Sequence, residues 1–179
     1  MERLGYENKY EILNAMDFGI PQKREWIFVI SYLGENRFDF ENLEKQRPRN
    51  IKEFIDQEVS ELYEVKQKSM LNCLRGEPNN LNFKGRLNVI DNFAYTICTK
   101  QVRVPNSGVV DIGNGKYRYL TERECLRLMG FEDEDVDIFE KEHPRRKNCM
   151  SSILYKQAGN SVVVDVLVGI LREIDRLEK

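Results

Sequence analysis

The clearest hydrophobic pattern lies at the C-terminal end of the chain. Beyond Ser161, apolar residues recur at three- and four-residue steps and charged residues fill the opposite face, which predicts an amphipathic helix. Its apolar positions are Val163, Val166, Leu167, Ile170, Leu171, Ile174 and Leu177. Just before it, Gly159 and Asn160 favour a tight turn, and Asn160 or Ser161 is a good N-cap. These residues fit either a capped helix that only packs or a helix start whose N–H groups bind a polar ligand.

Alternating and β-rich segments predict two hairpins. Tyr10 to Ala15 alternates along the chain, Trp26 to Tyr32 is a β-rich apolar run, and Gly and Pro residues lie between them. The segments 109–112 and 117–120 form a second pair, joined by Asn114-Gly115, a dipeptide typical of two-residue hairpin turns.

The segment between the two hairpins has a weaker pattern. Residues 34–50 are polar and predict a loop, whereas 51–62 has apolar residues at the spacing of a short amphipathic helix. Residues 63–91 show little periodicity and several turn formers, namely Gly76, Pro78, Asn79, Asn80, Asn82 and Gly85.

A capping box follows the second hairpin, with Thr121 as N-cap and Glu124 three residues later. The helix that it opens is predicted to run to about Met129, with Gly130 just beyond its C-terminus. We expect Arg123 and Glu124 to have structural roles. The stretch 132–142 is acidic and predicted to be solvated, and 143–147 is a basic loop.

Composition excludes several classes of protein. Among 179 residues, 41% are hydrophobic, which suffices for a packed core, but we find no apolar run long enough to span a membrane and no signal peptide. The four cysteines form no CxxC pair and the chain has one His. A metal site or a disulfide framework is therefore not expected, and the cysteines fit the reduced thiols of a cytosolic protein.

The charge is unevenly distributed. The net charge of −2 argues against a free-standing, non-specific DNA-binding protein. Residues 66–127, however, hold 11 Lys and Arg against 5 Asp and Glu, whereas the remainder holds 17 against 25. A basic middle segment is what contact with phosphates requires, although a chance fluctuation on a solvated surface gives the same count.

Three segments resemble motifs of the DNA cytosine-5 methyltransferases and occur in the order of that family. Phe18-Gly19-Ile20-Pro21-Gln22-Lys23-Arg24-Glu25-Trp26 resembles the eighth motif. Leu120-Thr121-Glu122-Arg123-Glu124, running on to Leu128-Met129-Gly130-Phe131, resembles the ninth. Gln157-Ala158-Gly159-Asn160-Ser161-Val162 resembles the tenth. Each motif alone is a weak signal, but together they span nearly the whole chain.

The resemblance implies transfer of a methyl group from S-adenosyl-L-methionine to carbon 5 of a flipped-out cytosine in double-stranded DNA. In the family, the eighth motif reads Gln-x-Arg-x-Arg and its arginines point into the cytosine pocket. Gln22 and Arg24 match, and Trp26 departs from the pattern. If a strand begins near Gln22, these three side chains project from one face.

The resemblance also implies sites for the cofactor and for DNA. Gly159, Asn160 and Ser161 match the part of the tenth motif that lines the S-adenosyl-L-methionine pocket. Thr96 matches a short stretch that opens the part of the recognition region touching the backbone beside the target base, although a plain strand residue would look the same. The ninth motif mainly holds the target-recognition region in place.

Two catalytic parts of the family are absent from this sequence. The nucleophilic cysteine of the family follows a proline, whereas the residues before these cysteines are Asn72, Ile97, Glu124 and Asn148. The glycine-rich loop that holds most of the cofactor is also missing. We therefore expect the catalytic half, and most of the S-adenosyl-L-methionine site, to lie in a complementary N-terminal methyltransferase half.

The expected fold is α+β, with a small target-recognition domain, a β-hairpin and a C-terminal helix that complete an α/β methyltransferase domain. The expected boundaries are 1–50 for the hairpin segment, 51–150 for the target-recognition domain and 151–179 for the returning segment. One chain of a two-chain enzyme and a C-terminal fragment of a longer one both fit. The competing class is a DNA-binding or regulatory module that has lost catalysis, which Trp26 mildly favours.

Overall fold

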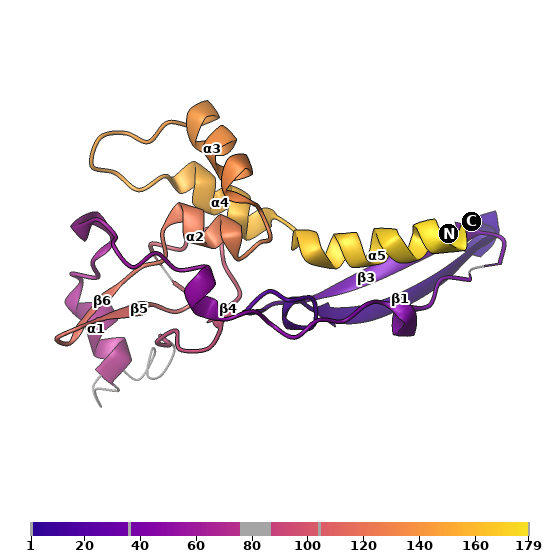
Figure 1. Cartoon of the computed structure of the whole chain (residues 1–179), viewed down its shortest axis with the longest axis horizontal. Coiled ribbons are helices and arrows are strands. Elements are labelled where there is room, and N and C mark those ends of the chain that lie inside the picture. The colour runs from indigo at the N-terminus through magenta and orange to yellow at the C-terminus, as the bar shows by residue number, and fades with distance from the viewer. Residues whose placement is uncertain (1, 36, 76–86, 104, 179) are drawn as a thin grey trace.

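The computed structural model describes residues 2–35, 37–75, 87–103 and 105–178, and the fold is mixed α and β (Figure 1). The strands are β1 (Tyr6–Asn14), β2 (Gln22–Lys23), β3 (Glu25–Leu33), β4 (Ala94–Tyr95), β5 (Val110–Gly113) and β6 (Lys116–Arg118). The α-helices are α1 (Lys68–Arg75), α2 (Glu122–Arg127), α3 (Asp133–Glu142), α4 (Ser152–Asn160) and α5 (Val164–Leu177). The expected combination of strands and helices is confirmed, whereas the expected domain boundaries stay predictions.

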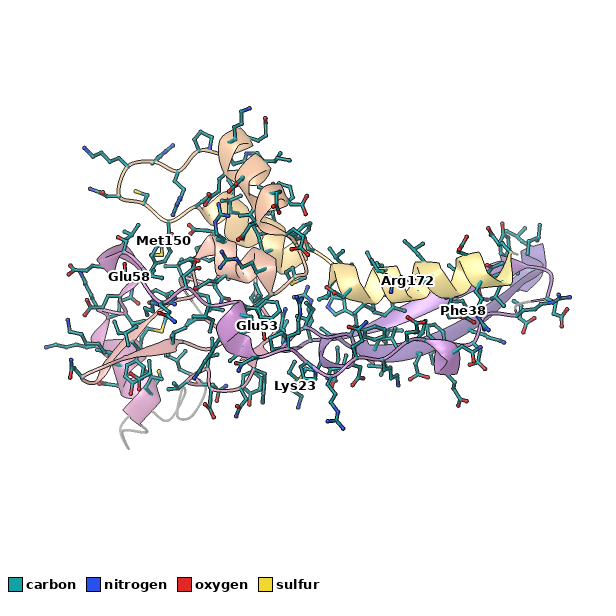
Figure 2. The ribbon with its side chains drawn as sticks, in the orientation of Figure 1. Lys23, Phe38, Glu53, Glu58, Met150 and Arg172 are labelled. Atoms are coloured by element: carbon teal, nitrogen blue, oxygen red, sulfur yellow. The ribbon has the colours of Figure 1, made fainter. Side chains whose placement is uncertain are left out.

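The long hairpin and helix α5 form one end of the molecule (Figure 1). Strands β1 and β3 pair antiparallel along their whole length, from Tyr6↔Leu33 to Asn14↔Glu25, which confirms the first predicted hairpin. Apolar side chains of the hairpin and of α5 belong to one core cluster, so the helix covers one face of the two strands. Phe38, from the predicted polar loop, is fully buried at this end (Figure 2).

The second predicted hairpin is also confirmed. Strands β5 and β6 pair antiparallel around Asn114 and Gly115, whose φ angles are 53° and 68°. Positive φ at both central residues is the geometry of a type I′ turn, which Asn-Gly adopts at little cost. An irregularity between Asp111 and Gly113 shifts the register of the pair.

The structure corrects the prediction for residues 157–161. Gln157 to Asn160 form the last turn of α4, and Ser161 is its C-cap, so neither Asn160 nor Ser161 caps α5. Helix α5 has Val163 as N-cap, with no side-chain hydrogen bond, and the amide of Val164 donates to the carbonyl of Met129 at 3.0 Å. The first turn of α5 is thus capped by a backbone carbonyl that is distant in sequence. A local sequence pattern cannot predict such a contact.

The segment Ser152–Leu177 is long and apolar enough to cross a membrane by length and composition alone, a criterion that helices packed in a protein core also meet. In the structure, residues 161–163 interrupt it and leave two helices, and one face of each packs into the core. Helix α4 packs beside α2, away from the hairpin, whereas α5 lies on the hairpin (Figure 1).

The helix predicted over 51–62 is absent. Two short 3-10 turns, Ile51–Glu53 and Glu61–Tyr63, occupy this stretch, and Asn50 and Ser60 each cap one of them through a side-chain oxygen. Two caps so close together divide the segment before an α-helix can form. Conversely, α1, α3 and α4 were not predicted. The turn formers Gly76, Pro78, Asn79, Asn80, Asn82 and Gly85 lie outside the described residues.

Helix α2 carries the predicted capping box. Thr121 accepts from the amide of Glu124, and the carboxylate of Glu124 accepts from the amide of Thr121 at 2.7 Å. The helix ends at Arg127, slightly earlier than predicted, and Gly130 has a φ of +85°, as its predicted place after the helix requires.

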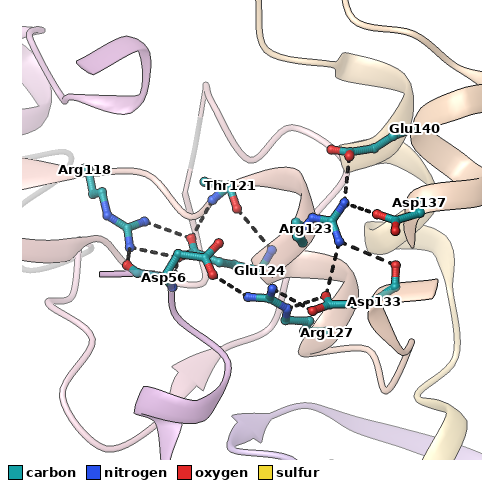
Figure 3. A network of polar contacts seen from close by, with 9 residues as sticks. All are labelled: Asp56, Arg118, Thr121, Arg123, Glu124, Arg127, Asp133, Asp137 and Glu140. Atoms are coloured by element: carbon teal, nitrogen blue, oxygen red, sulfur yellow. Dashed lines mark hydrogen bonds and ion pairs between the residues drawn. The ribbon is translucent and has the colours of Figure 1, made fainter. Parts of the chain in front are cut away.

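Polar contacts centred on α2 tie three segments of the chain together (Figure 3). Arg118 donates two hydrogen bonds of 2.8 Å to Glu124, and both side chains are buried. Arg123 pairs with Asp133, Asp137 and Glu140, so it holds α3. The structural roles predicted for Arg123 and Glu124 are thus what their contacts show.

We predict that Arg118→Met lowers the free energy of unfolding by about 3–5 kcal/mol, because it leaves the buried carboxylate of Glu124 without its countercharge. Urea denaturation measures this loss. Arg37→Met is the matched control, since Arg37 pairs with Glu35 on the surface, where we expect a change within about 0.5 kcal/mol. Equal effects of the two substitutions would contradict the structural role of the buried pair.

Candidate functional site

The segments of the eighth and tenth motifs meet beside strand β4. Strand β2 pairs in parallel with β4, in the register Gln22↔Ala94 and Lys23↔Tyr95. The end of α4 packs against the chain that leaves β4, at Cys98 and Thr99, and Arg24 donates a hydrogen bond to the carbonyl of Ile97 just before them. We call this meeting point the junction, made of residues 22–26, 96–99 and 157–161.

Gln22 is fully buried in the junction. Its side-chain amide donates to the carbonyl of Leu128 at 2.7 Å, and its side-chain oxygen accepts from the amide of Ile97 at 3.0 Å. Both ends of the side chain are therefore satisfied by backbone groups. Gln22 links the eighth motif to the end of the ninth.

Arg24 lies at the centre of the junction and is only 4% exposed. Nη1 donates to the carbonyl of Ile97 at 2.9 Å, and Nη2 donates to those of Gly159 and Ser161 at 3.0 and 2.9 Å. Burial lowers the pKa of Arg24 from its usual value. The positive charge lies at the C-terminal end of α4, where the helix dipole favours a cation.

Trp26 lies beside Arg24, as the predicted shared face requires. The guanidinium carbon of Arg24 is 4.9 Å from the centre of the indole ring, within the range of a cation–π interaction. With Leu13, Val162 and other apolar neighbours, Trp26 lines a cavity of only about 10 Å³. The indole therefore fills the space next to Arg24 while 39% of the residue remains exposed.

The three predicted cofactor residues differ in their surroundings. A Cβ atom on Gly159 would lie 2.4 Å from the amide nitrogen of Thr99, so the close approach that this glycine allows is to the backbone of the same chain. Ser161 donates its hydroxyl to the carbonyl of Gln157 at 2.9 Å. Asn160 is exposed at the end of α4.

Two buried polar atoms of the junction lack a hydrogen-bond partner within the part of the chain that the structure describes. They are Nε of Arg24, a donor, and Oε1 of Gln157, an acceptor. Buried polar groups in folded proteins are nearly always satisfied, so these two atoms mark a place where a water molecule, a ligand or a further segment of protein can form hydrogen bonds. Gln157, to which the sequence analysis assigned no role, is thus added to the site. Its place as the first residue of the segment that resembles the tenth motif was the available signal.

Thr96 lies at the edge of the junction. Its hydroxyl donates to the carbonyl of Lys23 at 3.0 Å, which fastens the end of β4 to β2.

Among the thiols, Cys125 is fully buried, and burial raises its pKa well above the usual range. Such a thiol is a poor nucleophile. Across the described residues, no group of three or more His, Cys, Asp and Glu side chains could hold a metal ion.

Comparison with proteins of known sequence gives one family. The family model described as C-5 cytosine-specific DNA methylase matches residues 1–176. The Type II methyltransferase M2.ScrFI of Lactococcus lactis subsp. cremoris is 37% identical over 97% of this chain and 47% of its own length. M.HhaI of Haemophilus parahaemolyticus is 30% identical over 93% of this chain and 53% of its own. The chain thus spans about half the length of the curated relatives it matches.

Solved structures share the fold at low sequence identity. The Entamoeba histolytica methyltransferase EhMeth superposes with a TM-score of 0.76 at 17% identity, over 99% of this chain and 56% of its own. The S. pombe Dnmt2 methyltransferase gives a TM-score of 0.74, also at 17% identity, over 99% of this chain and 61% of its own. The match of the family model over nearly all residues, in agreement with these folds, shows that the chain belongs to the C-5 cytosine-specific DNA methylase family.

Proposed function

We propose that this chain is the C-terminal part of a DNA cytosine-5 methyltransferase. It supplies DNA recognition and part of both the active site and the cofactor pocket, and a complementary N-terminal half supplies the nucleophilic cysteine. The methyl group comes from S-adenosyl-L-methionine and goes to carbon 5 of cytosine in double-stranded DNA. Membership of the family and coverage of about half of each relative support this division of labour.

The observation that carries the proposal is the pair of hydrogen bonds from Arg24 to Gly159 and Ser161. These bonds join two motifs more than 130 residues apart in sequence into one site. A methyltransferase needs this closeness, because the methyl donor and the target base must be held in contact.

For the cofactor, we propose that Gly159, Asn160 and Ser161 line one wall of the S-adenosyl-L-methionine pocket. The exposed amide of Asn160 offers both a donor and an acceptor to such a ligand. The unpartnered Oε1 of Gln157 lies in the same turn of helix and adds an acceptor. The bound cofactor would supply the activated methyl group, and these residues would orient it.

For the base, we propose that Gln22 and Arg24 have supporting roles. Arg24 holds the tenth motif against β2 and keeps one donor, Nε, unused, so its charge can stabilise negative charge that develops on the cytosine ring. Gln22 fixes the strand from which Arg24 projects.

For DNA, we propose that Thr96 contacts the backbone beside the target base. Not all basic residues of 66–127 are available to phosphates, because Arg118, Arg123 and Arg127 form ion pairs with carboxylates of this chain. The exposed residues Lys66, Lys68, Lys100 and Arg103 remain as candidates for phosphate contacts.

The second candidate is a catalytically inactive DNA-binding or regulatory module of the same family. Trp26 favours it, because the indole fills the position at which the family has a second arginine and contributes no positive charge. Both candidates predict DNA binding, so only assays of methyl transfer separate them.

We expect this chain alone to transfer no methyl groups, because no cysteine in it follows a proline. Addition of the complementary N-terminal half should restore transfer. Incorporation of labelled methyl groups into mixed-sequence DNA measures both results. Label on cytosine without the added half would refute the proposed division, and a stable but inactive assembly would favour the binding module.

In the assembled enzyme, Asn160→Ala should weaken binding of S-adenosyl-L-methionine about tenfold, the scale of one lost hydrogen bond, and leave DNA affinity unchanged. Calorimetric titration with each ligand measures the two affinities. Asn72→Ala is the control, since Asn72 is exposed on α1, far along the sequence from the junction. Unchanged cofactor binding would remove Asn160 from the proposed pocket.

Trp26→Arg should raise the single-turnover rate of the assembly on the order of a hundredfold, because it restores a charged donor beside the base. DNA affinity should stay the same. Trp26→Phe, which keeps an aromatic ring and adds no donor, is the control and should give no increase. A lower rate or an unfolded chain in the Arg variant would make Trp26 a packing residue.

A further inference from the structure

A groove lies in the middle part of the chain, outside the junction. Residues 51–57 form one side of it, residues 90–91 form another, and β5 with Arg118 of β6 closes the third. Its volume is about 550 Å³, which is in the range of ligand-binding clefts. We call this site the side groove. None of the described residues that line it belongs to the junction.

The interior of the side groove is aliphatic. Ile55, Ile90 and Val110 line it and are only partly buried, and their other contacts are with the main core. Ile112, which also lines it, is 46% exposed. The groove therefore exposes aliphatic surface contributed by three segments that are distant in sequence. Contiguous apolar surface that a fold leaves open is typical of binding sites.

The side groove is held open by contacts that already exist in the free chain. Arg118 donates a hydrogen bond to the carbonyl of Asp56 at 2.8 Å, which ties the first side to β6 (Figure 3). Ile90 donates its amide to the carbonyl of Val109 at 2.8 Å, which ties the second side to the residue before β5. A ligand that binds a preformed groove loses less free energy to ordering the protein.

The rim of the side groove carries unpaired negative charge. Asp91 and Asp111 are exposed, and neither forms an ion pair within the part of the chain that the structure describes. Their carboxylates accept hydrogen bonds from neutral groups, namely the side-chain amide of Asn92 and the backbone amide of Gly113. Both carboxylates therefore keep their full charge at the opening of the groove.

Basic residues compensate only part of this charge. Two of them line the groove: Arg118 is already paired with Glu124, and Lys52 is exposed. The adjoining segment 53–64 contains five Asp and Glu residues and no Lys or Arg. The surroundings of the groove are therefore negative, within a middle segment that is otherwise rich in basic residues.

These features select the chemistry of the occupant. A negative rim repels the phosphates of DNA, and the candidate phosphate contacts Lys66, Lys68, Lys100 and Arg103 lie outside the groove. An aliphatic interior favours a ligand that buries apolar side chains. A polypeptide segment in which Lys or Arg stands beside Ile, Leu or Val matches both the rim and the interior.

We propose that the side groove binds a basic segment of a partner protein. Aliphatic side chains of the segment pack on Ile55, Ile90 and Ile112, and its Lys or Arg side chains pair with Asp91 and Asp111. The groove lies outside the junction, so the partner binds without occupying the proposed active site. This interaction goes beyond methyl transfer and does not depend on it.

A phage-displayed library of random peptides, panned on the full chain, tests the proposal. The enriched peptides should combine Lys or Arg with Ile, Leu or Val. In fluorescence anisotropy, binding of the most enriched peptide should weaken at least about tenfold in the double variant Asp91→Asn with Asp111→Asn, because two charge pairs are lost. Ile112→Ser should weaken it about tenfold, because less aliphatic surface is buried.

Matched controls separate the groove from net charge and overall hydrophobicity. Asp17→Asn with Glu41→Gln removes the same charge from exposed residues outside the groove, and Ile138→Ser removes an isoleucine that is 59% exposed on α3. Both should change the affinity less than about twofold. All substituted side chains are exposed, so circular dichroism of every variant should match that of the parent. No enrichment of basic peptides, or equal weakening in groove variants and controls, would overturn the proposal.

Other occupants would give different results, and each would overturn the proposal. Binding of spermidine that is as tight as that of the peptide, and equally sensitive to both groove variants, would assign the groove to small cations. A loss of DNA affinity in Ile112→Ser as large as the loss of peptide affinity would assign it to DNA. Displacement of the peptide by the part of M2.ScrFI that this chain does not cover would assign it to the other half of a methyltransferase.

Discussion

A single buried guanidinium holds the junction together. Arg24 satisfies three backbone carbonyls that belong to two segments, one following β4 and one ending α4. Only arginine combines a permanent charge with several donors in a fixed plane, and a lysine at this position would supply a single nitrogen. The two contacts with Gly159 and Ser161 orient the tenth motif relative to the eighth, and the contact with Ile97 adds the segment that follows β4. The geometry of the junction therefore depends on this side chain.

The arrangement also depends on the absence of a side chain. Gly159 is in the last turn of a helix, where glycine is intrinsically unfavourable, yet any Cβ there would collide with the backbone at Thr99. The close contact lets Arg24 reach the carbonyls of Gly159 and Ile97 together. Loss of helix propensity at one residue is thereby offset by a contact that positions the whole site.

Much of the fold could be predicted from local sequence. The Asn-Gly turn, the Thr121 capping box and both hairpins are encoded by neighbouring residues, and the structure contains them. The motifs marked residues 22–26 and 157–161 as segments of a site, but they did not indicate that residues 96–99 lie between them. The partners of Arg24 could not be predicted, because carbonyl groups carry no sequence identity. Likewise, Gly159 suggested a turn, whereas in the structure it lies in the last turn of α4, close to the backbone of Thr99, a residue distant in sequence.

Because it is interrupted at residues 161–163, one apolar segment packs against two different parts of the molecule. Helix α4 packs beside α2, and α5 packs along the hairpin, on a different course (Figure 1). A continuous helix from Ser152 to Leu177 would be a rigid rod, and it could follow only one of these courses. The short non-helical link changes the direction of the chain between α4 and α5, and the hydrogen bonds from Arg24 to the carbonyls of Gly159 and Ser161 hold this link in place. Sequence changes that made residues 161–163 helical would therefore move α5 away from the hairpin, although both helices would still form.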